Sequence, residues 1–487
     1  MRAARVEVDV NEREIMEIAI VGGGAAAVGL LDALAARPGD QGRGRSGAGT
    51  VSVFEPSPQL WRGRPYGPDL ESVLVNAPPA IMSIRSGDFG HYAAWLGNRG
   101  AEHLDQLLGQ PLVPRAVYGE YLADTAEKAI AALGEQGWLV RVVPARVTEV
   151  RRTEARLVVR TQDGHEHPAT QVALCVGGGT PPDLYGLAGT EGFLADPYPL
   201  AQTLDGVPAE SDVAVIGSGL TAVDVVVSLA ARGHTGRITL LSRSGVLPHV
   251  WQRPNERRPQ HLTTERVAGL GMVTLDQLVE LFRAELADEN LNEFLAELLG
   301  TETEDPVERL RRQIAAIDDP STGRRVLQEA AHTVGPFVWR LLPEADRALV
   351  RRHLRTAASV ASPMVPVNAA TLMGLLDAGQ LTLVPGLQSI EVDNGRFRAH
   401  GNELITAQFV VNAVNPPPQA VPAMSRDLVR SLTQTGLATR HPSGGLIPAD
   451  PRVHVVGDLV GGGSFITSSI PGVAAQAARA ARSLRSP

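Results

Sequence analysis

The sequence predicts an α/β fold with two Rossmann-like units and a helical insert. Two glycine-rich loops, Gly22–Ala27 and Gly217–Ala222, each lie between an apolar run and a helical stretch, about 195 residues apart. This strand–loop–helix order is typical of a nucleotide-binding βαβ unit. Between about 274 and 355 apolar residues recur at helical spacing instead. Because 487 residues exceed what one core can hold, at least two domains are expected.

The first unit is predicted to contain a strand at Glu17–Val21, a helix at Ala25–Ala36 and a strand at Val51–Glu55. The segment Pro38–Gly49 is rich in glycine and arginine, which favours a surface loop. Residues 1–16 are expected to form an N-terminal tail. They lack the apolar core of a secretory signal, so the protein is expected to be cytoplasmic.

The second unit repeats the order, and further strands follow a helical region. Its strands are predicted at Val213–Ile216 and Arg237–Leu241, with a helix at Thr221–Ala231 between them. Later strands are predicted at Leu381–Val384, Ser389–Val392, Phe409–Val414 and Val453–Val456, and a final helix at Pro471 to about Leu484. In the helical region, Thr274 and Asp305 are each followed three residues later by Gln or Glu, a pattern typical of helix N-termini.

The first glycine-rich loop predicts a binding site for the pyrophosphate of FAD. Gly22 permits a tight turn and Gly24 lets the backbone approach the phosphates. Ala25 and Ala26 open a helix whose free N–H groups attract anions. Glu55 ends the next strand, where a carboxylate accepts hydrogen bonds from ribose hydroxyls. The alternative, a glycine-rich turn without a ligand, is disfavoured by this context.

The second loop predicts an NADPH site formed by Gly217, Gly219, Leu220 and Thr221. The next strand ends in Ser242-Arg243-Ser244 and carries no acid there. A hydroxyl and a guanidinium at this place would bind a ribose 2′-phosphate, which an acid would repel. The alternative is that Arg243 is an ordinary surface arginine.

The C-terminal region contributes two further candidates for FAD binding. Asp458 follows a predicted strand, where an acid binds the ribityl chain. Ile470 opens the last helix, whose N-terminus would face the flavin pyrimidine and stabilise negative charge. Simple packing of this alanine-rich helix is the alternative.

Composition excludes several other classes of protein. The net charge of −8 disfavours a nucleic-acid-binding surface, and no apolar stretch is long enough to span a membrane. The single cysteine, Cys175, excludes a redox-active cysteine pair and fits a buried strand. His165-Glu166-His167 favours a solvated turn over a metal site, so no metal is expected.

For two groups of side chains the sequence is compatible with either a structural or a functional role. The basic residues Arg351, Arg352, His353 and Arg355 favour a helix C-terminus, with recognition of an anionic substrate or carrier as the alternative. Trp251 and Trp339 fit either the core or the lining of a binding site.

These motifs resemble the flavoproteins with two dinucleotide-binding domains. More narrowly, the chain resembles bacterial FAD/NAD(P)-binding oxidoreductases related to the ornithine and lysine N-hydroxylases, a branch of the class B flavin monooxygenases. The matching segments are Gly22–Ala27, Glu55, Trp61–Gly67, Val75–Pro78 with Met82, Pro114-Arg115 with Tyr118, Gly119 and Tyr121, Gly217–Ala222 and Gly457-Asp458. The resemblance implies that Trp61, Arg62, Asn76 and Met82 line the flavin and that Val147 contacts the adenine region. The sequence departs from the family at Asp196, where relatives usually carry a histidine motif.

The resemblance implies an NADPH-dependent flavin monooxygenase. Such an enzyme forms a flavin C4a-hydroperoxide from O2 and oxygenates a small nucleophilic substrate, possibly one bound to a carrier. Two alternatives remain: an NADPH-dependent flavin reductase or dehydrogenase with another electron acceptor, and a non-catalytic flavin-bound partner protein. No catalytic side chain and no oligomeric state is predicted. The expected domains are FAD-binding at 17–204 and 366–487, with NADPH-binding at 205–365 between them.

Overall fold

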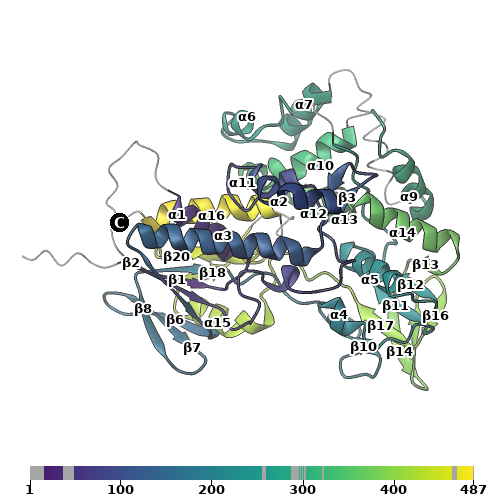
Figure 1. Cartoon of the computed structure of the whole chain (residues 1–487), viewed down its shortest axis with the longest axis horizontal. Coiled ribbons are helices and arrows are strands. Elements are labelled where there is room, and N and C mark those ends of the chain that lie inside the picture. Colours follow the sequence, from purple (N-terminus) through teal and green to yellow (C-terminus); the bar gives the residue numbers. More distant parts are fainter. Residues whose placement is uncertain are drawn as a thin grey trace, which may run out of the picture.

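The computed structural model describes residues 16–36, 49–254, 259–286, 303–320, 323–462 and 469–485, with a few single residues between 296 and 300. Residues 1–15 of the predicted tail, the loop at 38–48 and the last two residues lie outside these ranges, whereas Met16 already belongs to the first strand. The described part forms two parallel sheets side by side, with a helical lobe above them (Figure 1). The predicted α/β fold with two Rossmann-like units and a helical insert is therefore confirmed.

The first sheet is parallel and has the order β20-β9-β1-β2-β5. Its strands are β1 (Met16–Val21), β2 (Gly49–Phe54), β5 (Leu139–Val143), β9 (Gln171–Leu174) and β20 (Val453–Val455). Helices α1 (Ala25–Ala35), α3 (Arg115–Glu135) and α16 (Ile470–Arg485) cover one face (Figure 1). The antiparallel strands β6 (Val147–Arg152), β7 (Leu157–Thr161) and β8 (Glu166–Ala169) and helix α15 (Arg426–Gln434) lie on the other.

Alternation along β1 explains how the first sheet is buried on both faces. Ile18 and Ile20 join the core beneath the helices, whereas Ala19 and Val21 join the core against the antiparallel strands. Successive side chains of a strand point to opposite faces, so a continuous apolar run is what a two-sided sheet requires. Gly29 allows close packing of the helices, since a Cβ there would lie 3.4 Å from that of Ala477.

The second sheet has the order β10-β17-β11-β12-β13 and is also parallel. Its strands are β10 (Phe193–Leu194), β11 (Val213–Ile216), β12 (Ile238–Leu241), β13 (Leu381–Val384) and β17 (Phe409–Asn412). Helices α5 (Leu220–Ala231) and α14 (Pro366–Asp377) pack on one face, and β14 (Ser389–Asp393), β15 (Arg396–His400) and β16 (Leu404–Ala407) cover the other. The two units therefore have the same three-layer plan.

The predicted boundary at residue 365 is wrong. The segment 366–412, assigned by the sequence to the FAD domain, contributes α14, β13 and β17 to the second sheet. The chain returns to the first domain after β17, because α15 packs on β6 and β20 pairs with β9. An apolar run in the sequence predicts a buried strand, but it does not indicate which of two similar sheets the strand joins.

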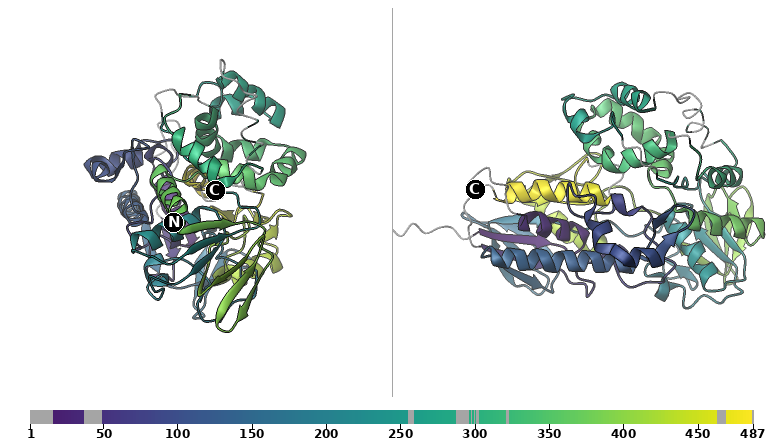
Figure 2. Two further views of the ribbon diagram at one scale, coloured as in Figure 1. Left: turned by 90° about the vertical axis from the view of Figure 1, so that its right-hand side faces the viewer. Right: turned by 45° about the horizontal axis from the view of Figure 1, so that its top comes forward.

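The insert is a lobe of short helices with its own apolar clusters (Figure 2). It comprises α6 (Thr264–Ala268), α7 (Leu275–Leu286), α9 (Pro306–Ala315), α10 (Gly323–Thr333), α11 (Gly335–Leu341), α12 (Glu344–Arg352) and α13 (Leu354–Ala361). Both predicted helix starts are present: Gln277 N donates to Thr274 Oγ1 (3.3 Å), and Val307 N donates to Asp305 Oδ1 (2.9 Å). The lobe is longer at both ends than the predicted 274–355.

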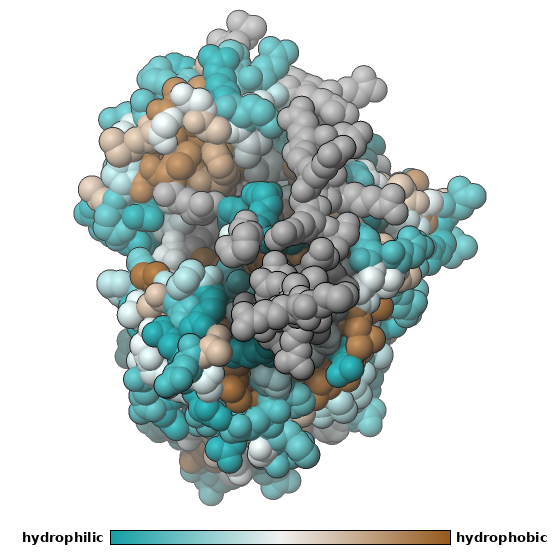
Figure 3. Space-filling model, turned by 90° about the vertical axis from the view of Figure 1, so that its left-hand side faces the viewer, coloured by the Kyte–Doolittle hydropathy of each residue, from teal (hydrophilic) through white to brown (hydrophobic). Residues whose placement is uncertain are grey.

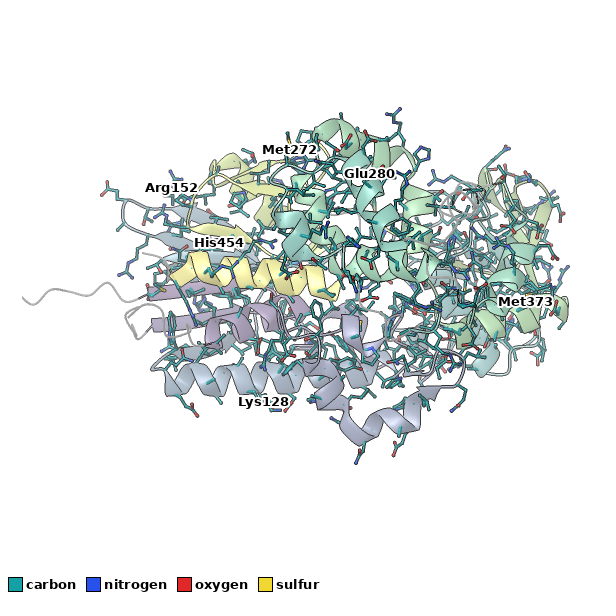
Figure 4. All side chains as sticks on the ribbon, turned by 90° about the horizontal axis from the view of Figure 1, so that it is seen from above. Lys128, Arg152, Met272, Glu280, Met373 and His454 are labelled. Carbon is teal, nitrogen blue, oxygen red and sulfur yellow. The ribbon has the colours of Figure 1, made fainter. Side chains whose placement is uncertain are left out.

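The insert also carries exposed apolar side chains. Leu270 and Met272 lie in the turn between α6 and α7, and Met272 is 69% exposed. An apolar patch is visible in the upper part of Figure 3, on the side of the molecule where the lobe stands. Figure 4 shows the lobe from above, with Met272 and Glu280 on it, next to α16.

A buried ion pair joins the two domains. Arg115, at the start of α3, donates from Nη2 to Asp224 Oδ2 of α5 (2.5 Å). Tyr198 donates its hydroxyl to the same oxygen, and Arg115 Nη1 donates to Tyr198 Oη (3.1 Å). Burial lowers the pKa of the Arg115 guanidinium, but Asp224 and Tyr198 outweigh burial and hold that pKa above its usual value. Burial raises the pKa of the Asp224 carboxyl, a rise that the nearby Arg115 guanidinium and Tyr198 hydroxyl oppose.

Candidate functional site

The first glycine-rich loop has the conformation that its predicted role requires. Gly22 has φ of 102°, and a Cβ there would lie 2.3 Å from the carbonyl oxygen of Cys175, so only glycine fits. Its N–H donates to Phe54 O (2.9 Å). Helix α1 then begins at Ala25, and the first N–H groups of a helix have no partner within it. The loop thus presents Gly24, Ala25 and Ala26 as a possible cradle for an anion.

A second loop closes over this cradle. Trp61 N donates to Gly23 O (2.7 Å), and the Trp61 side chain is buried. A Cβ on Gly24 would lie 3.4 Å from Gly63 Cα, so two backbones face each other here without side chains between them. Glycine at both positions permits this close contact of the two backbones, next to the N–H groups at the start of α1 where a pyrophosphate is expected. Arg62 extends away toward α3, where its Nη1 donates to Ala116 O (3.3 Å).

Glu55 holds the first loop in place. Its Oε2 accepts a hydrogen bond from Gly23 N and its Oε1 accepts one from Ser57 N, both at 2.8 Å. Each carboxylate oxygen can accept more than one bond, so a ribose hydroxyl remains compatible with this arrangement. Val147 lies on the opposite face of the sheet, in the core next to Phe54, which precedes Glu55.

Asn76 and Met82 lie on a loop fixed by aromatic side chains. Tyr118 donates its hydroxyl to Met82 O (2.7 Å), and Trp251 Nε1 donates to Asn76 O (2.7 Å). The side-chain Oδ1 of Asn76 is buried without a hydrogen-bond partner in the described protein. A buried orphan acceptor of this kind is compatible with a ligand N–H group, such as those of a flavin ring.

The C-terminal candidates meet the first loop. Gly457 lies over the first turn of α1, because a Cβ there would be 3.4 Å from that of Ala26. Asp458 follows it and lies near Tyr66, whose pKa rises to about 12 through burial and the nearby carboxylate. Ile470, the first residue of α16, shares the core with Ala26. The structure thus brings Gly22, Gly24, Ala25, Ala26, Glu55, Trp61, Asp458 and Ile470 together around the start of α1.

The second loop repeats the geometry of the first. Gly217 has φ of 120°, and a Cβ there would lie 2.8 Å from Ala413 O. Gly219 precedes α5, which begins at Leu220 and Thr221. Thr221 Oγ1 donates to Asn415 Oδ1 (3.2 Å), and a Cβ on Gly219 would be 3.4 Å from Asn415 Nδ2. Sequence reasoning missed Asn415, whose only signal is its position just after a strand at the same sheet edge.

Arg243 stands at the end of β12, on the same edge as Gly217. Its side chain is exposed, and it forms no ion pair with any described residue. Tyr185 lies close enough for the guanidinium to lower its phenol pKa, although burial raises that pKa overall. Ser242 Oγ is engaged in the turn, where it accepts a hydrogen bond from Gly245 N (2.8 Å). Arg243 therefore remains available to an anionic ligand, whereas Ser242 mainly shapes the turn.

Two tryptophans, one in the insert and one just before it, are hydrogen-bonded to loops that carry predicted FAD-binding residues. Trp251, just before the insert, reaches Asn76 as described above. Trp339 of α11 donates from Nε1 to Gly462 O (2.9 Å), in the loop that follows Asp458. Both tryptophans are buried, as core residues are. Their hydrogen bonds also connect the insert and the segment before it to the predicted site.

The position that departs from the family pattern is part of an ion pair. Asp196 pairs with Arg64, which belongs to the loop over the first glycine-rich turn. The Arg64 guanidinium also lies over the Tyr198 ring, 5.6 Å from its centroid. Asp196 therefore connects the linker between the domains to the loop that is predicted to line the flavin.

The other features singled out by the sequence have structural explanations, although the backbone of Cys175 lies beside Gly22. Cys175 is buried, and burial raises the pKa of its thiol to about 12. His165 is exposed in the turn before β8 and pairs with Asp163. Within the described ranges, no three metal-binding side chains gather in one place. Arg351 lies at the end of α12 and pairs with Glu344. Across the same ranges, we find no helix with the length and apolarity needed to cross a membrane.

Comparison with known proteins agrees with this geometry. Residues 19–179 match a family model described as FAD-NAD(P)-binding, which confirms the predicted class of cofactor for this segment. No curated protein matches the sequence. The whole chain resembles the cadaverine monooxygenase DfoA of Erwinia amylovora, with a TM-score of 0.56, 13% identity and coverage of 96% of this chain and 94% of that one.

Two further solved structures share the fold. The L-lysine 6-monooxygenase of Pseudomonas syringae has a TM-score of 0.54 at 16% identity, covering 96% of this chain and 98% of that one. The ornithine N-hydroxylase of Kutzneria sp. 744 has a TM-score of 0.52 at 13% identity, covering 96% and 99%. At these identities the likeness establishes the fold, which is that of the two-domain flavoproteins.

Proposed function

We propose that this protein is an NADPH-dependent flavin monooxygenase that oxygenates a small nucleophilic substrate. The observation that carries the proposal is the hydrogen bonding of Trp339 in the insert, and of Trp251 just before it, to the loops that carry Asp458 and Asn76, two residues expected to bind FAD. An insert fixed there excludes water from the site, and oxygen transfer depends on that exclusion. The single cysteine excludes a reductase that works through a cysteine pair.

Each part of the chain has a role in this proposal. The start of α1 holds the pyrophosphate, with the free N–H groups that follow Gly24 donating to the phosphate oxygens. The N-terminus of α16 faces the flavin pyrimidine and favours negative charge there. FAD, when bound, supplies the redox chemistry by taking hydride from NADPH and reacting with O2. The loop at Gly217 and the guanidinium of Arg243 hold NADPH.

Purified protein is expected to be yellow and to release FAD, and not FMN, on denaturation. Rapid mixing with NADPH should bleach the flavin, and O2 with a suitable substrate should yield an oxygenated product detectable by mass spectrometry. Stoichiometric release of hydrogen peroxide with every amine, sulfide or ketone tested would indicate an oxidase or reductase instead. If NADPH cannot reduce the bound flavin, the protein would instead be a non-catalytic flavin-bound partner protein.

Arg243→Ala is expected to weaken the use of NADPH by roughly tenfold or more and to leave NADH use nearly unchanged. The two cofactors differ by one phosphate, and charge-assisted hydrogen bonds contribute about 1.5–3 kcal/mol each. The measurement is the rate of flavin reduction across a concentration series of each cofactor. Arg237→Ala is the matched control, since Arg237 lies just before the other end of β12 and pairs with Asp212. An equal loss with both cofactors, or a wild-type preference for NADH, contradicts the assignment.

A further inference from the structure

A cluster of tyrosine and tryptophan rings lies next to the predicted flavin site. Tyr66, on the loop that covers the first glycine-rich turn, has its ring centroid 4.7 Å from that of Tyr118 on α3. Tyr118 also donates its hydroxyl to Met82 O, in a segment predicted to line the flavin. From Tyr118 the series continues to Tyr121 at 5.3 Å and from there to Trp95 at 5.5 Å. The rings therefore form a continuous series from the predicted flavin site to Trp95, which is half-buried.

Tyr121 has a proton acceptor beside its hydroxyl. Its Oη lies 2.8 Å from Nδ1 of His91, the first residue of α2 (His91–Leu96). Because Ile84 N already donates to this oxygen (3.1 Å), we assign the phenol as the donor to Nδ1. Burial lowers the pKa of His91, so its ring is neutral at physiological pH. A neutral imidazole can accept the phenol proton when the phenol loses an electron.

The two buried tyrosines next to Tyr121 lack such a base in the described part of the chain. Tyr118 donates to a backbone carbonyl, which does not take up a proton. Tyr92, whose ring centroid lies 4.8 Å from that of Tyr121, has a buried hydroxyl without a hydrogen-bond partner there. A phenol becomes a strong acid once it loses an electron, so its oxidation is easiest where a base stands next to it. Among these three phenols, that position is Tyr121.

We propose that Tyr121 is a redox-active tyrosine, which gives one electron to the flavin site through Tyr118 and its phenol proton to His91 Nδ1. The electron acceptor is oxidised FAD that has been excited by blue light. The products are FAD reduced by one electron, a neutral Tyr121 radical and a protonated His91, so electrons and protons balance. Return of the electron from the flavin, or of one from ferrocyanide through Trp95, draws the proton back from His91 and restores Tyr121.

This route returns excited flavin to its ground state before the flavin reacts with O2. Electron transfer requires neighbouring rings and no opening for a ligand, which suits side chains as buried as Tyr118 and Tyr121. The proposal requires bound FAD and is independent of the monooxygenase function proposed above.

The test is a flash of blue light on FAD-loaded full-length protein, followed by transient absorbance and by electron paramagnetic resonance of samples frozen under illumination. We expect a neutral tyrosyl radical in the wild type. Tyr121→Phe keeps the ring but removes the hydroxyl, and it should lose this radical signal. His91→Gln keeps a hydrogen-bond acceptor but no base, so the tyrosyl radical should decay faster than in the wild type.

Tyr92→Phe is the matched control, because it removes a hydroxyl from the same cluster that has no proton acceptor in the described protein. It should keep the tyrosyl radical of the wild type. A radical that persists in Tyr121→Phe, an equal loss in Tyr92→Phe, or a flavin-loaded wild type without a tyrosyl radical overturns the proposal. The FAD content of each variant and its reduction by NADPH are measured separately, so failure of the general function is seen independently.

Discussion

Asp224→Ala is expected to lower the free energy of unfolding by about 3–5 kcal/mol, the usual cost of leaving one partner of a buried ion pair behind. The Arg115 side chain is only 12% exposed and Asp224 is not exposed at all, so water cannot replace the lost carboxylate. Tyr198 would also lose the acceptor of its hydroxyl. These three residues come from α3, α5 and the linker between the domains. The loss of stability should therefore weaken the contact between the two domains.

The measurement is the denaturant midpoint followed by circular dichroism, with limited proteolysis at the domain junction as a second readout. Asp212→Ala is the matched control, since its pair with Arg237 is exposed and such pairs contribute at most about 1 kcal/mol. A similar small loss in both variants would mean that the junction is stabilised by its apolar contacts and not by the pair. A large loss of unfolding free energy in Asp224→Ala alone would support the buried ion pair as the main stabilising contact between the two domains.

The elements that the sequence predicted well are those with a local cause. The strands at Val213–Ile216 and Leu381–Val384 have the predicted bounds, because short apolar runs between turn residues allow little else. The helix after each glycine-rich loop begins within one residue of its prediction. In both loops the glycine after the strand takes a positive φ, which the fingerprint requires.

What could not be predicted depends on contacts between distant segments. The membership of β13 and β17 in the second sheet is set by pairing with β12 and β11, which no local pattern records. Asn415 became part of the second site only because β17 ends beside Gly219. Likewise, Trp339 and Gly462 are separated by 123 residues in the chain, and only the docking of the insert brings them together.

The position of Glu55 is as predicted, but its contact with the ribose remains a prediction. The sequence placed a carboxylate at the end of the second strand for the ribose, and the structure shows it bonded to Gly23 N. The same side chain thus shapes the loop that is expected to surround the phosphates. A substitution at Glu55 would therefore disturb the loop and the ribose contact together, which makes Glu55 a poor choice for testing the FAD site.

Gly24 offers the cleaner test, and Gly24→Val is expected to reduce FAD retention to under about one tenth of wild type. Gly24 has φ of −95°, which valine adopts readily, and it precedes α1 instead of lying within it. A Cβ there lies 3.4 Å from Gly63 Cα and 3.9 Å from Gly63 N, which are contacts without a collision. The added side chain would lie at the start of α1, beside the N–H groups where the pyrophosphate is expected. Gly22 would not serve, since any side chain there collides with Cys175 O whether or not FAD binds.

The measurement is the ratio of flavin to protein absorbance after purification and after incubation with excess FAD, with circular dichroism to confirm that the variant is folded. Gly134→Val is the matched control: Gly134 lies near the end of α3, where a Cβ meets nothing within 4 Å. It should keep its full complement of FAD. A folded Gly24→Val protein that still retains FAD would place the pyrophosphate elsewhere and remove the basis for the first site. Loss of FAD from Gly134→Val as well would mean that retention reports general stability. Loss confined to Gly24→Val would assign the pyrophosphate to the start of α1 beside Gly24, because that is where the two variants differ.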